Sequence, residues 1–181
     1  MIYPTLTLRQ PYANLKMTPH KPSETRSWPA PKACRMGQII AIHAGLTPVA
    51  NTLDEYDVGE ETVALMMRCL GITDLRQFLT GLPLGAVVGI CSFIWCYRTS
   101  YMDMRRPDIP VLEPTVFADT HDRELGDFSP GRYAWVMNPI RLFDEPVPAK
   151  GKQGVWGWEM PEDLHEQLIA DGDILAAKDQ P

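Results

Sequence analysis

The side chains best suited to chemistry lie in a short segment near the N-terminus, HKPSETRSWP at His20 to Pro29. Side chains alternate along an extended segment. We therefore expect Glu24, Arg26 and Trp28 to project from one face and Thr25 from the other. A carboxylate, a guanidinium and an indole on one surface can accept hydrogen bonds, donate them and stack on a planar polar ligand.

Lys21 precedes this surface and adds a second cation. Because Pro22 follows it, its backbone favours extended geometry, and we expect it on a loop at the mouth of the surface. A purely structural alternative stays open for the segment. In that alternative, Glu24 and Arg26 form an ordinary surface ion pair and Trp28 packs in the core, as most such residues do.

Apolar and β-branched runs predict the strands that must position this segment. They lie at Pro4–Leu8, Gln38–His43, Gly85–Tyr97, Arg132–Met137 and Ile140–Val147, with a last short strand that ends at Trp158. Proline donates no hydrogen bond to a strand ladder, so we expect Asn138 and Pro139 to separate the strand at 132–137 from the strand at 140–147. Gly89 lies within the longest run and is typical of a bulge that curls a sheet.

Helical patterns predict three further units. Pro11 suits the first turn of a short helix that continues to Lys16. Two helices between about residues 51 and 81 read as an insertion packed on the sheet, in which we expect no chemistry. Pro161 opens a C-terminal amphipathic helix, followed by an acidic tail. The expected organisation is therefore an α+β fold with one domain at residues 1–160, and a helix and tail at 161–181.

The charge distribution limits the ligands that the chain can hold. Its net charge of −6 argues against nonspecific binding along a nucleic-acid duplex. Residues 1–50 nevertheless contain six Lys and Arg residues against one acid, Glu24. A basic face on an acidic body suits a small anionic or polar ligand, or a short nucleic-acid segment.

Several classes of protein are disfavoured by what the sequence lacks. It has no leader of basic and apolar residues and no apolar run of about 20 residues, so we expect a cytoplasmic protein without a membrane partner. The four cysteines include no Cys-x-x-Cys pair, which indicates reduced thiols. The run DTHDRELG at 119–126 does not gather three ligands on one face, so we expect no metal and no cofactor.

Six segments in order carry a family resemblance: LTLRQPYANL, HKPSETRSWP, QIIAIHAG, LPLGAVVGICSF, GDFSPGRYAWVM and KGKQGVWGW. Together they resemble the ASCH family of the PUA-like group, from about Leu6 to Trp158. The most specific element is Lys-x-x-Glu-x-Arg, here Lys21, Glu24 and Arg26. The resemblance implies a PUA-like, curled, mixed or antiparallel β-barrel with flanking helices and a helical insertion. Its cleft is implied to be lined by the Lys, Glu and Arg of this element.

The resemblance also implies several functions. ASCH relatives are associated with nucleic-acid binding, small members hydrolyse N4-acylated cytidine, and a ribonuclease activity is assigned to others. In the amidohydrolase members a threonine stands third after the lysine, where this sequence has Glu24, and its threonine is Thr25. A shift of one residue on an extended segment turns a side chain to the opposite face. We therefore expect that the protein binds its ligand and does not hydrolyse it, with hydrolysis as the alternative.

The expected partner is single-stranded nucleic acid, in particular RNA, or a modified nucleoside. The residues expected to bind it are Lys21, Glu24, Arg26, Trp28, His43, Arg132, Tyr133 and Lys152. Trp28 or Tyr133 would stack on a base, Glu24 would accept from an exocyclic amine, and the lysines would contact phosphate. In the metal-independent amidohydrolase alternative, Lys21, Glu24 and Thr25 are the catalytic candidates. A ribonuclease and a protein-interaction module remain as further alternatives.

Overall fold

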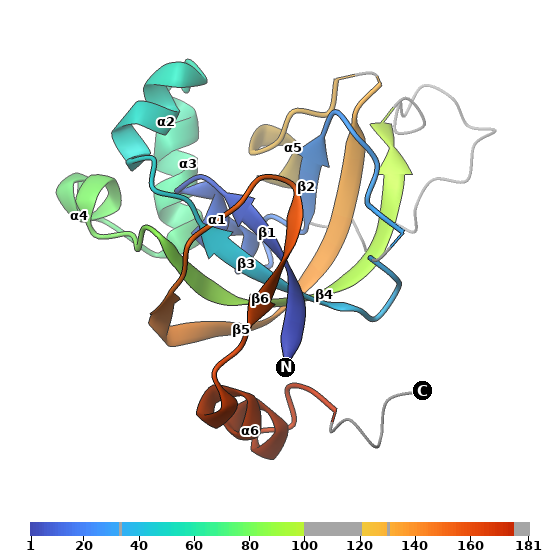
Figure 1. Ribbon diagram of the computed structural model, residues 1–181. Helices are drawn as coiled ribbons and strands as arrows, with labels where there is room; N and C mark the ends of the chain where they lie inside the picture. Colours follow the sequence, from blue (N-terminus) through green and yellow to red (C-terminus); the bar gives the residue numbers. More distant parts are fainter. Residues whose placement is uncertain (33, 100–120, 130, 176–181) are drawn as a thin grey trace.

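A curled six-stranded sheet with helices on both faces forms the body of the protein (Figure 1). The structure is a computed structural model that describes residues 1–32, 34–99, 121–129 and 131–175. Its elements within these ranges are β1 (Ile2–Leu8), α1 (Tyr12–Lys16), β2 (Ser23–Arg26), β3 (Ile39–Ala44), α2 (Val49–Glu55), α3 (Glu60–Leu70), α4 (Leu75–Thr80), β4 (Ala86–Arg98), α5 (His121–Glu124), β5 (Tyr133–Pro148), β6 (Val155–Glu159) and α6 (Glu162–Ala170).

The strand order is β2-β5-β4-β3-β1-β6, with β1 and β3 parallel and all other neighbours antiparallel. The expected mixed sheet with flanking helices and a helical insertion is confirmed. The sheet is not closed into a barrel, because β2 and β6 lie at its two edges. It is nevertheless strongly curled: Arg26 Nη2 of β2 donates to the Thr7 carbonyl of β1 at 3.2 Å, across three intervening strands in the order.

Part of this curl arises at Gly89, where the pairing of β4 with β5 shifts register. A Cβ atom on Gly89 would lie 2.3 Å from the Arg141 carbonyl oxygen and 2.7 Å from Met17 Cε. No side chain fits in that space. The bulge expected at this glycine is therefore confirmed, and it lets β5 and α1 approach β4 closely.

The interruption expected at Asn138 and Pro139 is wrong, because β5 runs without a break over 16 residues. Pro139 lies opposite Cys91, and the register of the β4–β5 pair shifts between Ile90 and Cys91. This irregularity accommodates a residue that has no N–H to donate. A proline inside a long strand is thus tolerated where the ladder is already disrupted.

Three apolar clusters fix the helices to the sheet. One packs between the sheet and α1, and includes Leu6, Ala13, Met17, Ile42 and Trp135. Alternate strand residues face the other way and pack against α6, with Ala41, Ile90, Phe143, Trp158 and Leu168 among them. The third cluster joins α1 to the insertion helices through Leu15, Val49, Leu65, Met66 and Phe78. The insertion is thereby anchored to the sheet through α1.

Two parts of the chain that the sequence analysis considered lie largely outside the described residues. They are the start of the DTHDRELG run, at 119–120, and the end of the acidic tail, at 176–181. Among the helices that the structure describes, none combines the length and the apolar character required to cross a membrane.

Candidate functional site

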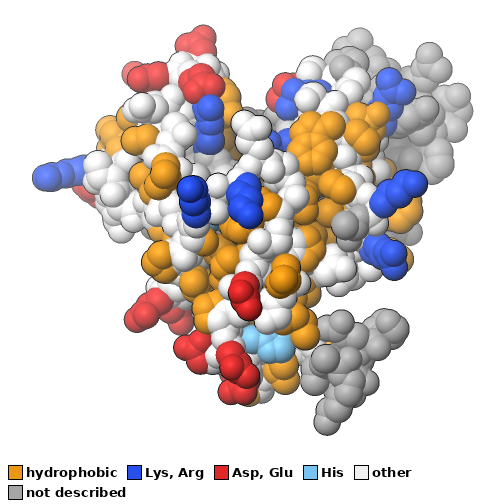
Figure 2. Space-filling view, viewed as in Figure 1, with side chains coloured by type: hydrophobic (Ala, Val, Ile, Leu, Met, Phe, Trp, Pro, Cys, Tyr) orange, Lys and Arg blue, Asp and Glu red, His pale blue; other side chains and the backbone are white. Residues whose placement is uncertain are grey.

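A cleft of about 1380 Å³ opens between β2 and the helical insertion, where the curled sheet fails to close. Its walls come from residues 6–12, 21–28, 56–62, 124–127 and 149–154, with additional contributions from Arg132 and from His43 to Thr47. Figure 2 shows the surface hollowed between these two sides, with Lys and Arg side chains around the hollow and acidic side chains at the end of the helical insertion and near α6. All the residues expected to bind a ligand line this cleft except Tyr133.

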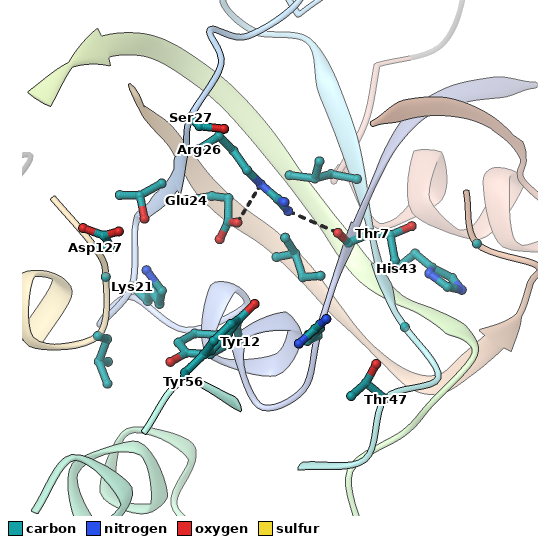
Figure 3. A pocket seen from close by; sticks show the side chains of 18 of the residues that line it. Thr7, Tyr12, Lys21, Glu24, Arg26, Ser27, His43, Thr47, Tyr56 and Asp127 are labelled. Carbon is teal, nitrogen blue, oxygen red and sulfur yellow. Dashed lines mark hydrogen bonds and ion pairs between the residues drawn. The ribbon is translucent and has the colours of Figure 1, made fainter. Parts of the chain in front are cut away.

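Glu24 and Arg26 form the polar wall of the cleft on β2. Glu24 Oε1 lies 2.9 Å from Arg26 Nε, and Arg26 Nη2 donates to the Thr7 carbonyl (Figure 3). The Nε–H of Arg26 is not aligned for a hydrogen bond, so the contact with Glu24 is an ion pair. Residues two apart on a strand share a face, and Glu24 and Arg26 do so, as the alternation predicts; their ion pair is the contact that the structural alternative describes. Glu24 is 9% exposed and is held beside the guanidinium.

Lys21 is almost entirely buried at the edge of the same cleft, at 2% exposure. Its Nζ donates to the Ser23 carbonyl at 2.7 Å and lies 3.8 Å from Asp122 Oδ1. The same Asp122 oxygen accepts from the Ser23 N–H at 3.2 Å. These contacts suit an ammonium that donates hydrogen bonds. They give no support to Lys21 as a base, which would need a free electron pair.

Behind Lys21 lies a second buried lysine that the sequence analysis missed. Lys16 Nζ donates to three backbone carbonyls, those of Lys21, Pro22 and Met137, at 3.1, 2.7 and 2.6 Å. Burial lowers the pKa of Lys16 to about 8. All three N–H bonds of the ammonium are used, so Lys16 fixes the backbone that carries Lys21.

The Lys150–Gly154 loop forms a further wall of the cleft, and the side chains of His43 and Thr7 hold it in place. His43 Nε2 lies 3.0 Å from the Ala149 carbonyl, and Thr7 Oγ1 donates to the Lys152 carbonyl at 3.0 Å. A carbonyl only accepts, so His43 Nε2 carries the proton. His43 is 1% exposed, and burial lowers its pKa below the usual value. The geometry thus gives His43 a supporting role beneath the loop.

Two exposed lysines occupy the rim of this loop. Lys150 and Lys152 form no ion pair with any residue that the structure describes, and Lys152 Nζ lies 5.9 Å from the Trp156 ring centroid. Arg26, by contrast, is neutralised by Glu24. The unpaired positive charge of the cleft therefore lies at its rim, where a phosphate group can reach it.

Three further residues were expected to bind a ligand, and each has different surroundings. Trp28 is half-buried and stacks edge-on against Trp135, with ring centroids 4.6 Å apart. Arg132 donates from Nη2 to the Thr25 carbonyl at 3.2 Å, and its Nε lies 3.2 Å from Asp127 Oδ2. Tyr133 packs against the cluster between the sheet and α1 and does not line the cleft. Of the two aromatic residues expected to stack on a base, the geometry favours Trp28.

The helical insertion also lines the cleft, which the sequence analysis did not expect. Tyr56 follows α2, and its ring centroid lies 6.0 Å from that of Tyr12 at the start of α1. Burial, and to a smaller degree the neighbouring Tyr56 and Glu24, raise the pKa of Tyr12 to about 12. The Tyr12 hydroxyl is therefore a neutral hydrogen-bond donor near Glu24 at any physiological pH.

Within the described part of the chain, no three His, Cys, Asp or Glu side chains come together as a metal site. The functional groups that the cleft presents to a ligand are a buried carboxylate, aromatic rings and the lysines at its rim. No family model matches the sequence, and no curated protein matches it either.

Proposed function

We propose that the chain is an ASCH-type module that binds the base of single-stranded nucleic acid, or a modified nucleoside, in this cleft. We further propose that its curled sheet is a PUA-like barrel left open at the cleft. The Lys-x-x-Glu-x-Arg element lines the cleft, whose volume of about 1380 Å³ exceeds the roughly 300–1,000 Å³ typical of small-molecule sites. A nucleotide, and not only a base, has room there.

The observation that carries this proposal is the Glu24 carboxylate, which is 9% exposed and paired with Arg26 at 2.9 Å. A carboxylate only accepts hydrogen bonds, so it selects a ligand edge that donates them. The exocyclic amine of cytosine or adenine is such an edge, whereas uracil offers a carbonyl at the same position. Lys150 and Lys152 supply unpaired charge at the rim for the phosphate of the same ligand.

The enzymatic alternatives receive less support from the geometry. In the amidohydrolase alternative Lys21 acts as a base, but its Nζ donates to the Ser23 carbonyl and lies close to Asp122. In the ribonuclease alternative His20 or His43 must reach a phosphate, but His43 is buried and bonded to the Ala149 carbonyl, and His20 packs against His121 and does not line the cleft. Binding requires none of these residues to move.

A titration with nucleoside 5′-monophosphates, followed by tryptophan fluorescence, tests the proposal. We expect the cytidine and adenosine nucleotides to bind more tightly than the uridine nucleotide. Glu24→Gln removes the acceptor charge but keeps the shape, so it should weaken cytidine binding by about 1–3 kcal/mol. Glu166→Gln, on the exposed surface of α6 outside the cleft, is the matched control and should bind like the wild type.

The same samples decide between binding and hydrolysis. Incubation with N4-acetylcytidine, followed by absorbance, should leave the acetyl group in place. Release of cytidine that is lost in Lys21→Ala would replace the binding proposal with the amidohydrolase alternative. If no nucleotide binds, or if all bind equally well to the wild type and to Glu24→Gln, the proposal fails.

A further inference from the structure

Two tyrosines from different helices present aromatic surface to the cleft. Tyr12 and Tyr56 both line it, with ring planes inclined by 54° (Figure 3). Tyr56 is 52% exposed, so much of its ring is free to contact a ligand. A large exposed aromatic side chain in a concave site is a frequent contact for planar ligands.

The backbone that carries Tyr56 is held in a defined turn. The Val58 N–H donates to the Leu53 carbonyl at 3.0 Å and the Asp57 N–H to the Asp54 carbonyl at 3.2 Å, the pattern of a Schellman motif. Asp57 adopts the left-handed conformation that this motif requires, with φ of 49°. The position of the Tyr56 ring is thus set by the end of α2.

Arg9 supports the same ring from β1's end of the cleft. Its guanidinium carbon lies 5.5 Å from the Tyr56 ring centroid, and it forms an ion pair with Glu55. A cation over an aromatic ring stabilises the arrangement. The insertion, α1 and the end of β1 therefore meet at one aromatic wall.

We infer that Tyr12 and Tyr56 form a stacking wall for the ligand, so that the cleft accepts an unpaired nucleobase lying on these rings with its edge toward Glu24. This inference rests on the proposed function. Glu24 and the two tyrosines line the same cleft, so a base on the rings can direct its edge to the carboxylate (Figure 3). A base inside a duplex has both faces covered by its neighbours and presents none to such a wall. Free nucleotides and single strands are therefore the ligand class.

Substitutions of Tyr56 test the wall, with cytidine 5′-monophosphate and a single-stranded cytidine hexanucleotide as probes. Tyr56→Leu keeps an apolar side chain but removes the ring, and we expect its affinity for both probes to fall about 10- to 100-fold. Tyr56→Phe keeps the ring and should bind like the wild type. Leu75→Ala, an exposed position of α4 in the same insertion and outside the cleft, is the control and should also bind like the wild type.

Each outcome decides a different point. If the wild type binds the probes and Tyr56→Leu binds them equally well, the wall is refuted while the proposed function stands. If Tyr56→Phe loses as much affinity as Tyr56→Leu, a hydroxyl contact replaces stacking. If a double-stranded RNA of the same length binds as tightly as the single strand, the ligand class is wrong. If the wild type binds neither probe, the proposed function and the wall fail together.

Discussion

Gly151 packs directly against the His43 imidazole. A Cβ atom at this position would lie 2.4 Å from His43 Cε1 and 2.7 Å from Nδ1. The imidazole is buried and bonded to the Ala149 carbonyl, so it has little freedom to move aside. A single methyl group at Gly151 therefore must displace either the ring or the loop that carries Lys150 and Lys152.

We predict that Gly151→Ala lowers the free energy of unfolding by about 1–3 kcal/mol, because it overpacks this contact. It should also weaken nucleotide binding, since the loop forms one wall of the cleft. Chemical denaturation and the fluorescence titration measure the two effects. Gln167→Ala, on the exposed surface of α6 outside the cleft, is the control. Equal stability of the two variants would show that the loop is not held by His43.

At the scale of single residues, the sequence predicted contacts between near neighbours. Glu24 and Arg26 are two residues apart on an extended segment, and alternation alone places them on one face. The contact between Lys21 and Asp122 joins residues about a hundred positions apart, and no local pattern indicates it. A lysine buried beside three carbonyls, as Lys16 is, also runs against the general preference of lysine for solvent.

Helix α1 connects to the cleft through Lys16, its last residue. Lys16 supplies three hydrogen bonds to backbone carbonyls that lie before β2 and within β5. We predict that Lys16→Met lowers the free energy of unfolding at pH 7 by about 1–3 kcal/mol, because it leaves buried acceptors without a donor. Lys32→Met, on the exposed surface, should change it little. Thermal and chemical denaturation compare the two.

The free energy of unfolding of Lys16→Met should also depend on pH differently from that of the wild type. Burial lowers the pKa of Lys16 from 10.5 to about 8 in the folded protein. Between these values the unfolded chain binds more protons than the folded one, so this group makes the free energy of unfolding rise with pH. Lys16→Met lacks the titration, and the stability gap between wild type and variant should widen from pH 8 to 10.5. A gap that stays constant would mean that Lys16 titrates normally.

At the scale of elements, runs with a clear period were predicted well. The β-branched run at 38–43 is β3, and the apolar run at 85–97 is β4. The insertion was expected as two helices and has three, α2, α3 and α4. Its role in the cleft was missed because it depends on how Tyr56, after α2, packs beside Tyr12 of α1, which is a long-range contact. The continuous β5 was missed because a register shift in its partner strand offsets the effect of Pro139.

Across the whole molecule, the cleft lies where the sheet curls but does not close. Its walls include β2 and the loop before β6, and β2 and β6 are the two edge strands of the sheet. The excess of basic residues in the first 50 positions did not locate the positive charge of the cleft, because Lys16 and Lys21 are buried and Arg26 is paired with Glu24. The cleft depends on the curl at Gly89 and on the contact of Arg26 with the Thr7 carbonyl. Both join residues that are far apart in the sequence, so no local pattern predicts them.

An NMR titration of the labelled protein with cytidine 5′-monophosphate tests most directly whether a nucleobase occupies the cleft. We predict shifts of the Trp28 indole signal and of the Gly151 and Gly154 amide signals, because all three residues line the cleft. The Trp158 indole, packed in the cluster against α6, should stay unchanged. Saturable shifts confined to Trp158 and its surroundings, or none at millimolar nucleotide, would contradict the account.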